Sequence, residues 1–183
     1  MIARKFCHGV PQFLTAICLL MVVTMVRAHL IAAQHGTVNF TNGGAFLVLS
    51  VPVSALNGVD DDGDGALSAQ ELSWHTSEIE RQLYDGVQLL DDSGGLLPLQ
   101  GLLLSLTSPE NAPTAPARQL VALGRFLVDV AVLSPGLRIT LRGETSEEQR
   151  ISITATRDSQ SQVMEFTPDR EYHTIFPHEN LEK

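Results

Sequence analysis

Closely spaced acidic side chains mark the stretch from residue 60 to residue 71. Asp60, Asp62 and Asp64 alternate with other residues, and Glu71 closes the stretch. Calcium prefers six to eight oxygen ligands at about 2.3–2.6 Å, which carboxylates and backbone carbonyls supply. Without a cation, so many neighbouring carboxylates would repel one another. The residue types and their spacing therefore predict a calcium site.

The same stretch fits the twelve-residue calcium loop of the EF-hand motif. In loop order, the predicted ligands are Asp60, Asp62, Asp64, the backbone carbonyl of Ala66, Ser68 and both carboxylate oxygens of Glu71. Gly65 permits the sharp turn of such a loop, and Leu67 is expected to anchor the loop in the core. Asp61 has no ligand role in the pattern and is expected to face water. Average residue frequencies give a chance match in about one of 10⁵ chains of this length, so chance is a poor explanation.

An amphipathic helix is expected directly after the loop, over residues 68–90. Ser68 and Glu71 stand three residues apart in the capping-box pattern that marks the start of a helix. The apolar residues of one helix face recur at helical spacing: Leu72, Ile79, Leu83 and Val87. The calcium loop and the helix are thus expected to share their boundary residues.

The calcium loop is expected to stand alone. Pro52 and Gly58 interrupt the residues that precede it, so these predict a strand rather than a long entering helix. Asp91 and Asp92 begin no second loop, because the twelfth residue counted from either is a leucine. Paired EF-hands cooperate in opening a groove for a target, so an unpaired loop favours structural calcium over calmodulin-like sensing.

Most other segments alternate apolar and polar residues, which is typical of half-buried strands. The turn Asn42-Gly43-Gly44 is expected to join strands over residues 37–40 and 45–53 as a hairpin. Further strands are expected over residues 102–106, 126–132, 137–141, 151–154 and 163–166. Short strands separated by turns predict a mainly β fold, an antiparallel β-sandwich (Ig-like or related) with one inserted EF-hand loop and an amphipathic helix.

The first 28 residues have the form of a secretory signal peptide. Arg4 and Lys5 precede an uncharged apolar run over residues 13–26, and Ala28 offers a cleavage site. As a helix, that run would be about 21 Å long, which is short of the ~30 Å membrane core. We therefore predict residues 1–28 as a cleaved signal peptide, a single β-rich domain over residues 29–176, a loose tail over residues 177–183, and a periplasmic or secreted location.

The composition excludes several classes of function. The chain has 12 Lys and Arg against 21 Asp and Glu, so no nucleic-acid partner is expected. Its 44% of hydrophobic residues excludes a disordered chain. Cys7 and Cys18 would both leave with the leader, so the remaining domain has no thiol or disulfide chemistry. The sequence holds no Gly-x-Ser-x-Gly, no His-Glu-x-x-His and no phosphate loop, and we expect no enzyme.

Two alternative functions stay open beside a non-catalytic calcium-binding protein. Cleavage after Ala28 would leave His29 as the first residue, and an amino group with an imidazole can chelate copper or nickel. That arrangement would make the protein a metal-handling accessory protein. Alternatively, the domain could be an interaction module braced by calcium, with a protein partner at the membrane or the cell surface.

The order of the parts carries a resemblance to a known family. The chain resembles the extracytoplasmic region of bacterial HupE/UreJ-type proteins, a family associated with hydrogenase and urease accessory membrane proteins. The resemblance lies in the order of a leader, Ala28-His29, a strand pair, one calcium loop with its helix, and then several strands. The resemblance spans roughly residues 29–176. It implies an exported β-rich segment ahead of membrane helices, and a role in metal-ion transport. No membrane helices follow in this sequence, so the transport role is not carried over, and the calcium ligands rest on the EF-hand motif alone.

Overall fold

The computed structural model describes residues 34–177, except for residues 42–43, 109–111, 113 and 130. The described part forms two sheets and one α-helix. The larger sheet holds, in spatial order, β5 (Leu99–Leu106), β6 (Gln119–Phe126), β2 (Gly44–Pro52), β1 (His35–Thr41), β8 (Ile151–Arg157) and β9 (Gln160–Phe166). The smaller sheet holds β10 (Tyr172–Thr174), β7 (Gly136–Ile139), β3 (Val87–Leu90) and β4 (Leu96–Leu97). The helix is α2 (Ala69–Gly86), and a 3₁₀ turn, η1 (Val53–Ala55), follows β2.

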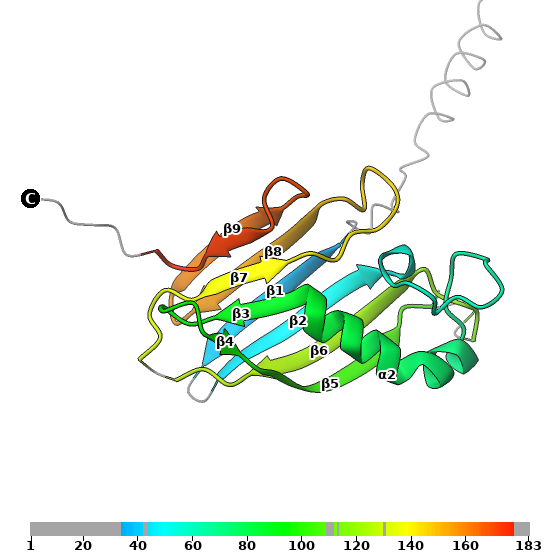
Figure 1. The fold of residues 1–183 in the computed structure, drawn as a ribbon, viewed down its shortest axis with the longest axis horizontal. Helices are drawn as coiled ribbons and strands as arrows, with labels where there is room; N and C mark the ends of the chain where they lie inside the picture. Colours follow the sequence, from blue (N-terminus) through cyan, green and yellow to red (C-terminus); the bar gives the residue numbers. More distant parts are fainter. Residues whose placement is uncertain (1–33, 42–43, 109–111, 113, 130, 178–183) are drawn as a thin grey trace, which may run out of the picture. The chain divides into compact units, whose positions relative to one another are not determined.

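The smaller sheet and α2 both lie over one face of the larger sheet (Figure 1). Their inward side chains share one apolar core with that face, to which Leu47 of β2, Ile79 of α2 and Leu137 of β7 all belong. Neighbouring strands run antiparallel in every pair except β1 and β8, which run parallel. The predicted mainly β, sandwich-like fold is confirmed, with this one parallel pair as a departure.

The expected hairpin at the start of the domain is present as β1 and β2. Val38 lies opposite Leu47 in an antiparallel register, and the burial of β1 alternates at every residue. This alternation follows from the two-residue period of a strand, which sends successive side chains to opposite faces. The same two strands lie in the middle of the larger sheet and thus position the chain that leads into the loop at residue 60.

The predicted helix over residues 68–90 is too long at its C-terminal end. The helix ends at Gly86, and Val87 begins strand β3, in which Val87 pairs with Ile139 and Leu89 with Leu137. The misreading arises because Val87 fits both the helical spacing of the residues before it and the two-residue alternation of those after it. Gly86 also packs closely on the core, since a Cβ atom built there would lie 2.6 Å from Leu141 Cγ.

The strand expected over residues 126–132 is also wrong, because β6 ends at Phe126. Phe126 lies opposite Ala45, one residue from the start of β2, so the neighbouring strand offers almost no further pairing. Leu127 instead donates its backbone N–H to the carbonyl of Pro98 and leaves the sheet. The apolar alternation in the sequence continues to residue 132, past the point at which the neighbouring strand ends, and the strand was therefore predicted too long.

Several predictions lie outside the described residues. They are the signal peptide over residues 1–28, the candidate ligand His29 and nearly all of the tail over residues 177–183. In the part of the chain that the structure describes, no helix has the length and apolar character needed to cross a membrane.

Candidate metal site

The loop over residues 60–71 begins without an α-helix ahead of it. Strand β2, the 3₁₀ turn η1 and a bend lead into the loop, and α2 follows it. Two hydrogen bonds fix the start of the loop to the helix: Asn57 N–H donates to Gln82 Oε1, and Gln82 Nε2 donates to the carbonyl of Asn57, both at 2.8 Å. Gln82 thus holds the residues ahead of the loop against α2, a role that the packing of an entering helix has in a complete EF-hand. The expectation that no long entering helix exists is confirmed for the described residues.

Leu67, in the middle of the loop, is held from the other side. It forms an antiparallel bridge with Ala117: Leu67 N–H donates to the carbonyl of Ala117 at 2.8 Å, and Ala117 N–H donates to the carbonyl of Leu67 at 3.0 Å. Its side chain has no exposed surface and belongs to the core. The predicted anchor role of Leu67 is therefore confirmed, and the segment before β6 satisfies its backbone groups.

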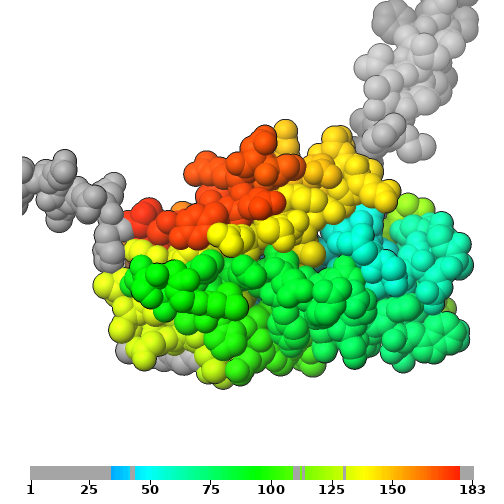
Figure 2. All heavy atoms as spheres, viewed as in Figure 1, coloured from blue at the N-terminus to red at the C-terminus, as the bar shows by residue number. Residues whose placement is uncertain are grey.

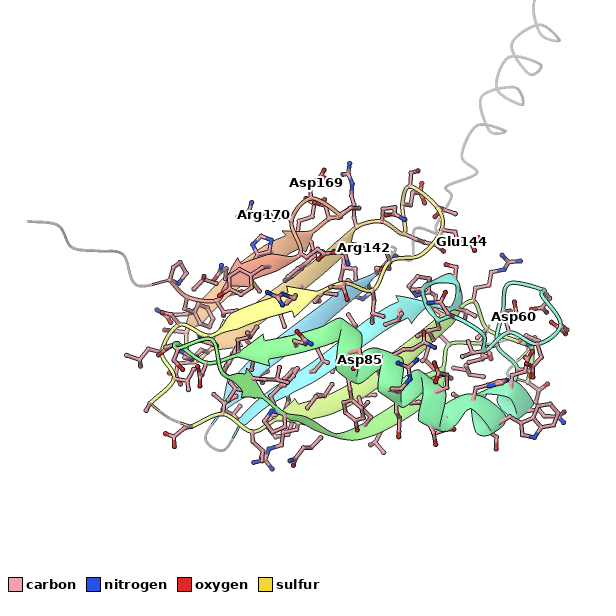
Figure 3. The ribbon with its side chains drawn as sticks, in the orientation of Figure 1. Asp60, Asp85, Arg142, Glu144, Asp169 and Arg170 are labelled. Carbon is pink, nitrogen blue, oxygen red and sulfur yellow. The ribbon has the colours of Figure 1, made fainter. Side chains whose placement is uncertain are left out.

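The structure brings three of the predicted ligands together. One carboxylate oxygen each from Asp60, Asp62 and Glu71 lie within 4.8 Å of one another. Figure 3 labels Asp60 in the loop beside the start of α2, and the loop lies at the surface of the molecule in Figure 2. Asp60 also shapes the turn, because Oδ1 accepts from Gly63 N–H and Oδ2 from Gly65 N–H, both at 2.8 Å. Both glycines have positive φ angles, 72° and 74°, so the predicted sharp turn is present.

The other three predicted ligands lie in the same loop but outside that group of oxygens. Asp64 Oδ1 accepts a hydrogen bond of 2.8 Å from the backbone N–H of Ala66. Ser68 is the N-cap of α2, and its Oγ accepts from the N–H of Glu71 at 3.2 Å. In this geometry, Asp64, Ala66 and Ser68 order the loop and its junction with the helix.

Glu71 completes the predicted capping box. Its Oε2 accepts from the N–H of Ser68 at 2.8 Å, and its Oε1 accepts from the N–H of Asp61 at 2.9 Å. These hydrogen bonds, those of Ser68 first, lower the pKa of Glu71 from 4.5 to about 2. A carboxylate held in this way is fully ionised at neutral pH, and its side chain is buried in the fold. Glu71 thus presents a fixed negative charge at the point where the loop meets the helix.

Asp62 shows the opposite effect. The backbone N–H of Asp64 acts to lower its pKa, but partial desolvation and the charges of Asp64 and Glu71 outweigh this and raise the pKa. The raised pKa means that ionised Asp62 is destabilised by the carboxylates around it. A divalent cation among these oxygens would remove that repulsion.

Asp61 is exposed to water, as the motif predicts, and it also contacts the helix. Both of its carboxylate oxygens lie 3.0 Å from Nε2 of His75, one helical turn beyond Glu71 on α2. This contact ties the loop to the helix a third time, after Gln82 with Asn57 and the capping box. Fourteen residues separate Asp61 from His75, and no local sequence pattern links them, so only the fold reveals the pair.

The donor set fits calcium better than a transition metal. Asp60, Asp62 and Glu71 supply only oxygen atoms, and a carboxylate oxygen that accepts one hydrogen bond keeps a second lone pair for a cation. Among the described residues, they form the only group of three or more acidic, histidine or cysteine side chains close enough to share an ion. His75 contacts Asp61, and His173 Nε2 lies 2.8 Å from the carbonyl of Glu165. Neither histidine belongs to that group.

Comparisons of this chain with protein-family models and with curated proteins give no match. The resemblance to HupE/UreJ-type proteins and the assignment of the EF-hand motif therefore rest on the sequence pattern described above.

Proposed function

We propose that this protein is an exported, non-catalytic calcium-binding protein whose single EF-hand-type loop holds Ca²⁺ in a structural role. Asp60, Asp62 and Glu71 would contact the ion first. Asp64, the carbonyl of Ala66 and Ser68 would complete the shell after local rearrangement of the loop. The expectation of export rests on the leader over residues 1–28.

The observation that carries the proposal is the agreement of motif and geometry at Glu71. The motif requires a glutamate at the twelfth loop position, and in the fold this glutamate is buried, ionised and within 4.8 Å of the oxygens of two aspartates at the first and third positions. Helix capping by itself accounts for the fixed position of Glu71, but it does not require the aspartates at the first and third positions to lie beside it.

A structural role is favoured over sensing by the way the loop is held. Asn57, Leu67 and Asp61 each bond to residues outside the loop or on α2, so the elements around the loop are already docked. A sensor needs a helix pair that opens on calcium binding. Here α2 packs on the core through Ile79 and Leu83, which are almost fully buried.

The proposal is tested by calorimetric titration of the purified protein with CaCl₂. We expect one site, with a dissociation constant on the order of 10⁻⁵–10⁻³ M, as in extracellular calcium modules, and weak competition by Mg²⁺. Glu71→Gln removes the charge at the twelfth position and should abolish the binding heat. Glu80→Gln makes the same change on α2 outside the loop and should bind calcium as the wild type does.

No calcium heat at millimolar metal would refute the proposal. Unchanged binding in Glu71→Gln would also refute it, since calcium would then bind elsewhere.

A further inference from the structure

The outward face of the larger sheet is uncovered in the described part of the chain. Helix α2 and the smaller sheet lie over its other face (Figure 1). The burial of β1 alternates between exposed and buried residues, so that every second side chain of this central strand points away from the core. The same holds for Phe46 and Val48 on β2, which are 47% and 41% exposed.

A row of uncharged side chains crosses this outward face on all six strands. Successive strand pairings place its members in register: Leu103 (β5), Leu123 (β6), Val48 (β2), Thr37 (β1), Thr154 (β8) and Val163 (β9). Leu103 and Val163, at the two ends of the row, are 68% and 69% exposed. Both ends of the row are therefore apolar and accessible.

Charge is almost absent from this face, although the chain carries 21 acidic residues. Among the described outward side chains of the six strands, Glu165 is the only acidic one, and it lies on the edge strand β9, 3.5 Å from Arg150. Arg125 lies over the ring of Phe46, at 5.7 Å from its centroid. Two copies of so acidic a molecule repel each other, and this face is where they can meet without opposing carboxylates.

The size of the face suits a second copy. Six strands about 4.8 Å apart and about seven residues long at 3.3 Å each span roughly 24 by 23 Å. Burying this face on two copies removes about 1,100 Å² from water, which exceeds the roughly 1,000 Å² expected of a specific interface. Sheets of this kind pack face to face with their strands nearly aligned.

We propose that this protein forms a homodimer in which the outward faces of the two larger sheets pack on each other. A two-fold axis along the strand direction reverses the strand order, so that Leu103 of one copy meets Val163 of the other, and Val48 meets Thr37. Glu165 then opposes β5 of the other copy, whose strand residues carry no charge. The face is thus complementary to itself.

The proposal is tested by sedimentation equilibrium of the purified protein. We expect a monomer–dimer equilibrium with a dissociation constant on the order of 10 µM, as suits an interface near the lower limit of size. Either Leu103→Glu or Val163→Glu places a carboxylate at one end of the row in each copy. Each substitution should raise the dissociation constant of the dimer at least tenfold. Leu96→Glu is the matched control, because Leu96 is 63% exposed but lies on β4 in the other sheet.

Salt gives an independent readout. Raising NaCl from about 0.05 M to about 0.5 M should strengthen the dimer, because the contact is uncharged and the repulsion between the acidic copies is screened. A protein that stays monomeric at all concentrations would overturn the proposal. A dimer that persists in Leu103→Glu and Val163→Glu would also overturn it, because that result indicates association through another segment. Dissociation at high salt would overturn it as well, because that result indicates a polar contact.

Discussion

At the scale of single residues, Glu71 joins the acidic loop over residues 60–71 to the helix that follows it. Its carboxylate accepts hydrogen bonds from Ser68 and Asp61, and it lies beside Asp60 and Asp62. The capping bond uses one lone pair of Oε2 and the bond from Asp61 uses one lone pair of Oε1, so calcium coordination can use the others. The same side chain can therefore order the helix before calcium binds and hold the ion afterwards.

The lowered pKa of Glu71 gives a prediction for the protein in chelator. The pKa is about 2 in the fold and 4.5 as the ordinary value, so ionised Glu71 stabilises the fold above pH 4.5. That contribution is lost as the pH falls from about 4.5 towards 2. We expect Glu71→Gln to reduce the loss of stability over this range, as measured by urea unfolding at several pH values.

Glu80→Gln is the control for this experiment, because Glu80 lies on the same helix outside the capping box. A pH dependence in Glu71→Gln equal to that of the wild type would contradict the assigned role of the capping box.

At the scale of elements, local signals identified the start of α2 but not its end. Ser68 and Glu71 are close in sequence, and the capping box they form is confirmed. The end of the helix depends on Gly86 and Val87, which contact Leu141 and pair with Ile139, more than 50 residues further along the chain. Such long-range contacts leave no local pattern, and this also explains why the bridge between Leu67 and Ala117 was not predicted.

The loop residues also divide into those that the local sequence predicts and those whose contacts depend on the fold. The three carboxylates that the structure brings together, those of Asp60, Asp62 and Glu71, are all among the ligands that the motif predicts, because their spacing is fixed by the loop itself. It could not predict that Gln82 holds Asn57 or that His75 contacts Asp61, since these pairs depend on how α2 packs beside the loop. The mainly β class was predictable from alternation, whereas the parallel pairing of β1 with β8 was not.

The two hydrogen bonds between Gln82 and Asn57 give a prediction at this scale, and Gln82 Nε2 also donates to Glu78 Oε1 at 2.8 Å. Asn57 is exposed, so water can replace both bonds, and each contributes about 0.5–1.5 kcal/mol net. Gln82→Ala should therefore lower the free energy of unfolding by about 1–3 kcal/mol and weaken calcium binding, because the start of the loop is released. Chemical denaturation and calorimetry measure the two effects.

Ser77→Ala is the control, since Ser77 lies exposed on the same helix outside the loop. Equal calcium affinity in Gln82→Ala and the wild type would show that this pair does not support the loop.

At the scale of the whole molecule, one apolar core supports both sheets and α2. The only cysteines are Cys7 and Cys18, so the described residues contain no disulfide. The core joins both sheets and α2 in one cluster. We therefore expect the fold to persist without calcium, and the proposed calcium at the start of α2 to add a modest gain in stability rather than a condition for folding.

The most direct test of this account is the melting temperature of the protein in calcium and in chelator, with and without Asp60→Ala. At free Ca²⁺ about tenfold above the dissociation constant, binding adds roughly 1.4 kcal/mol, or about 3–6 °C for a domain of this size. Asp60→Ala should lose this rise entirely and keep its far-ultraviolet circular dichroism. An absent rise in the wild type, an equal rise in Asp60→Ala, or strong binding of an apolar dye only with calcium would contradict a structural calcium site in this loop.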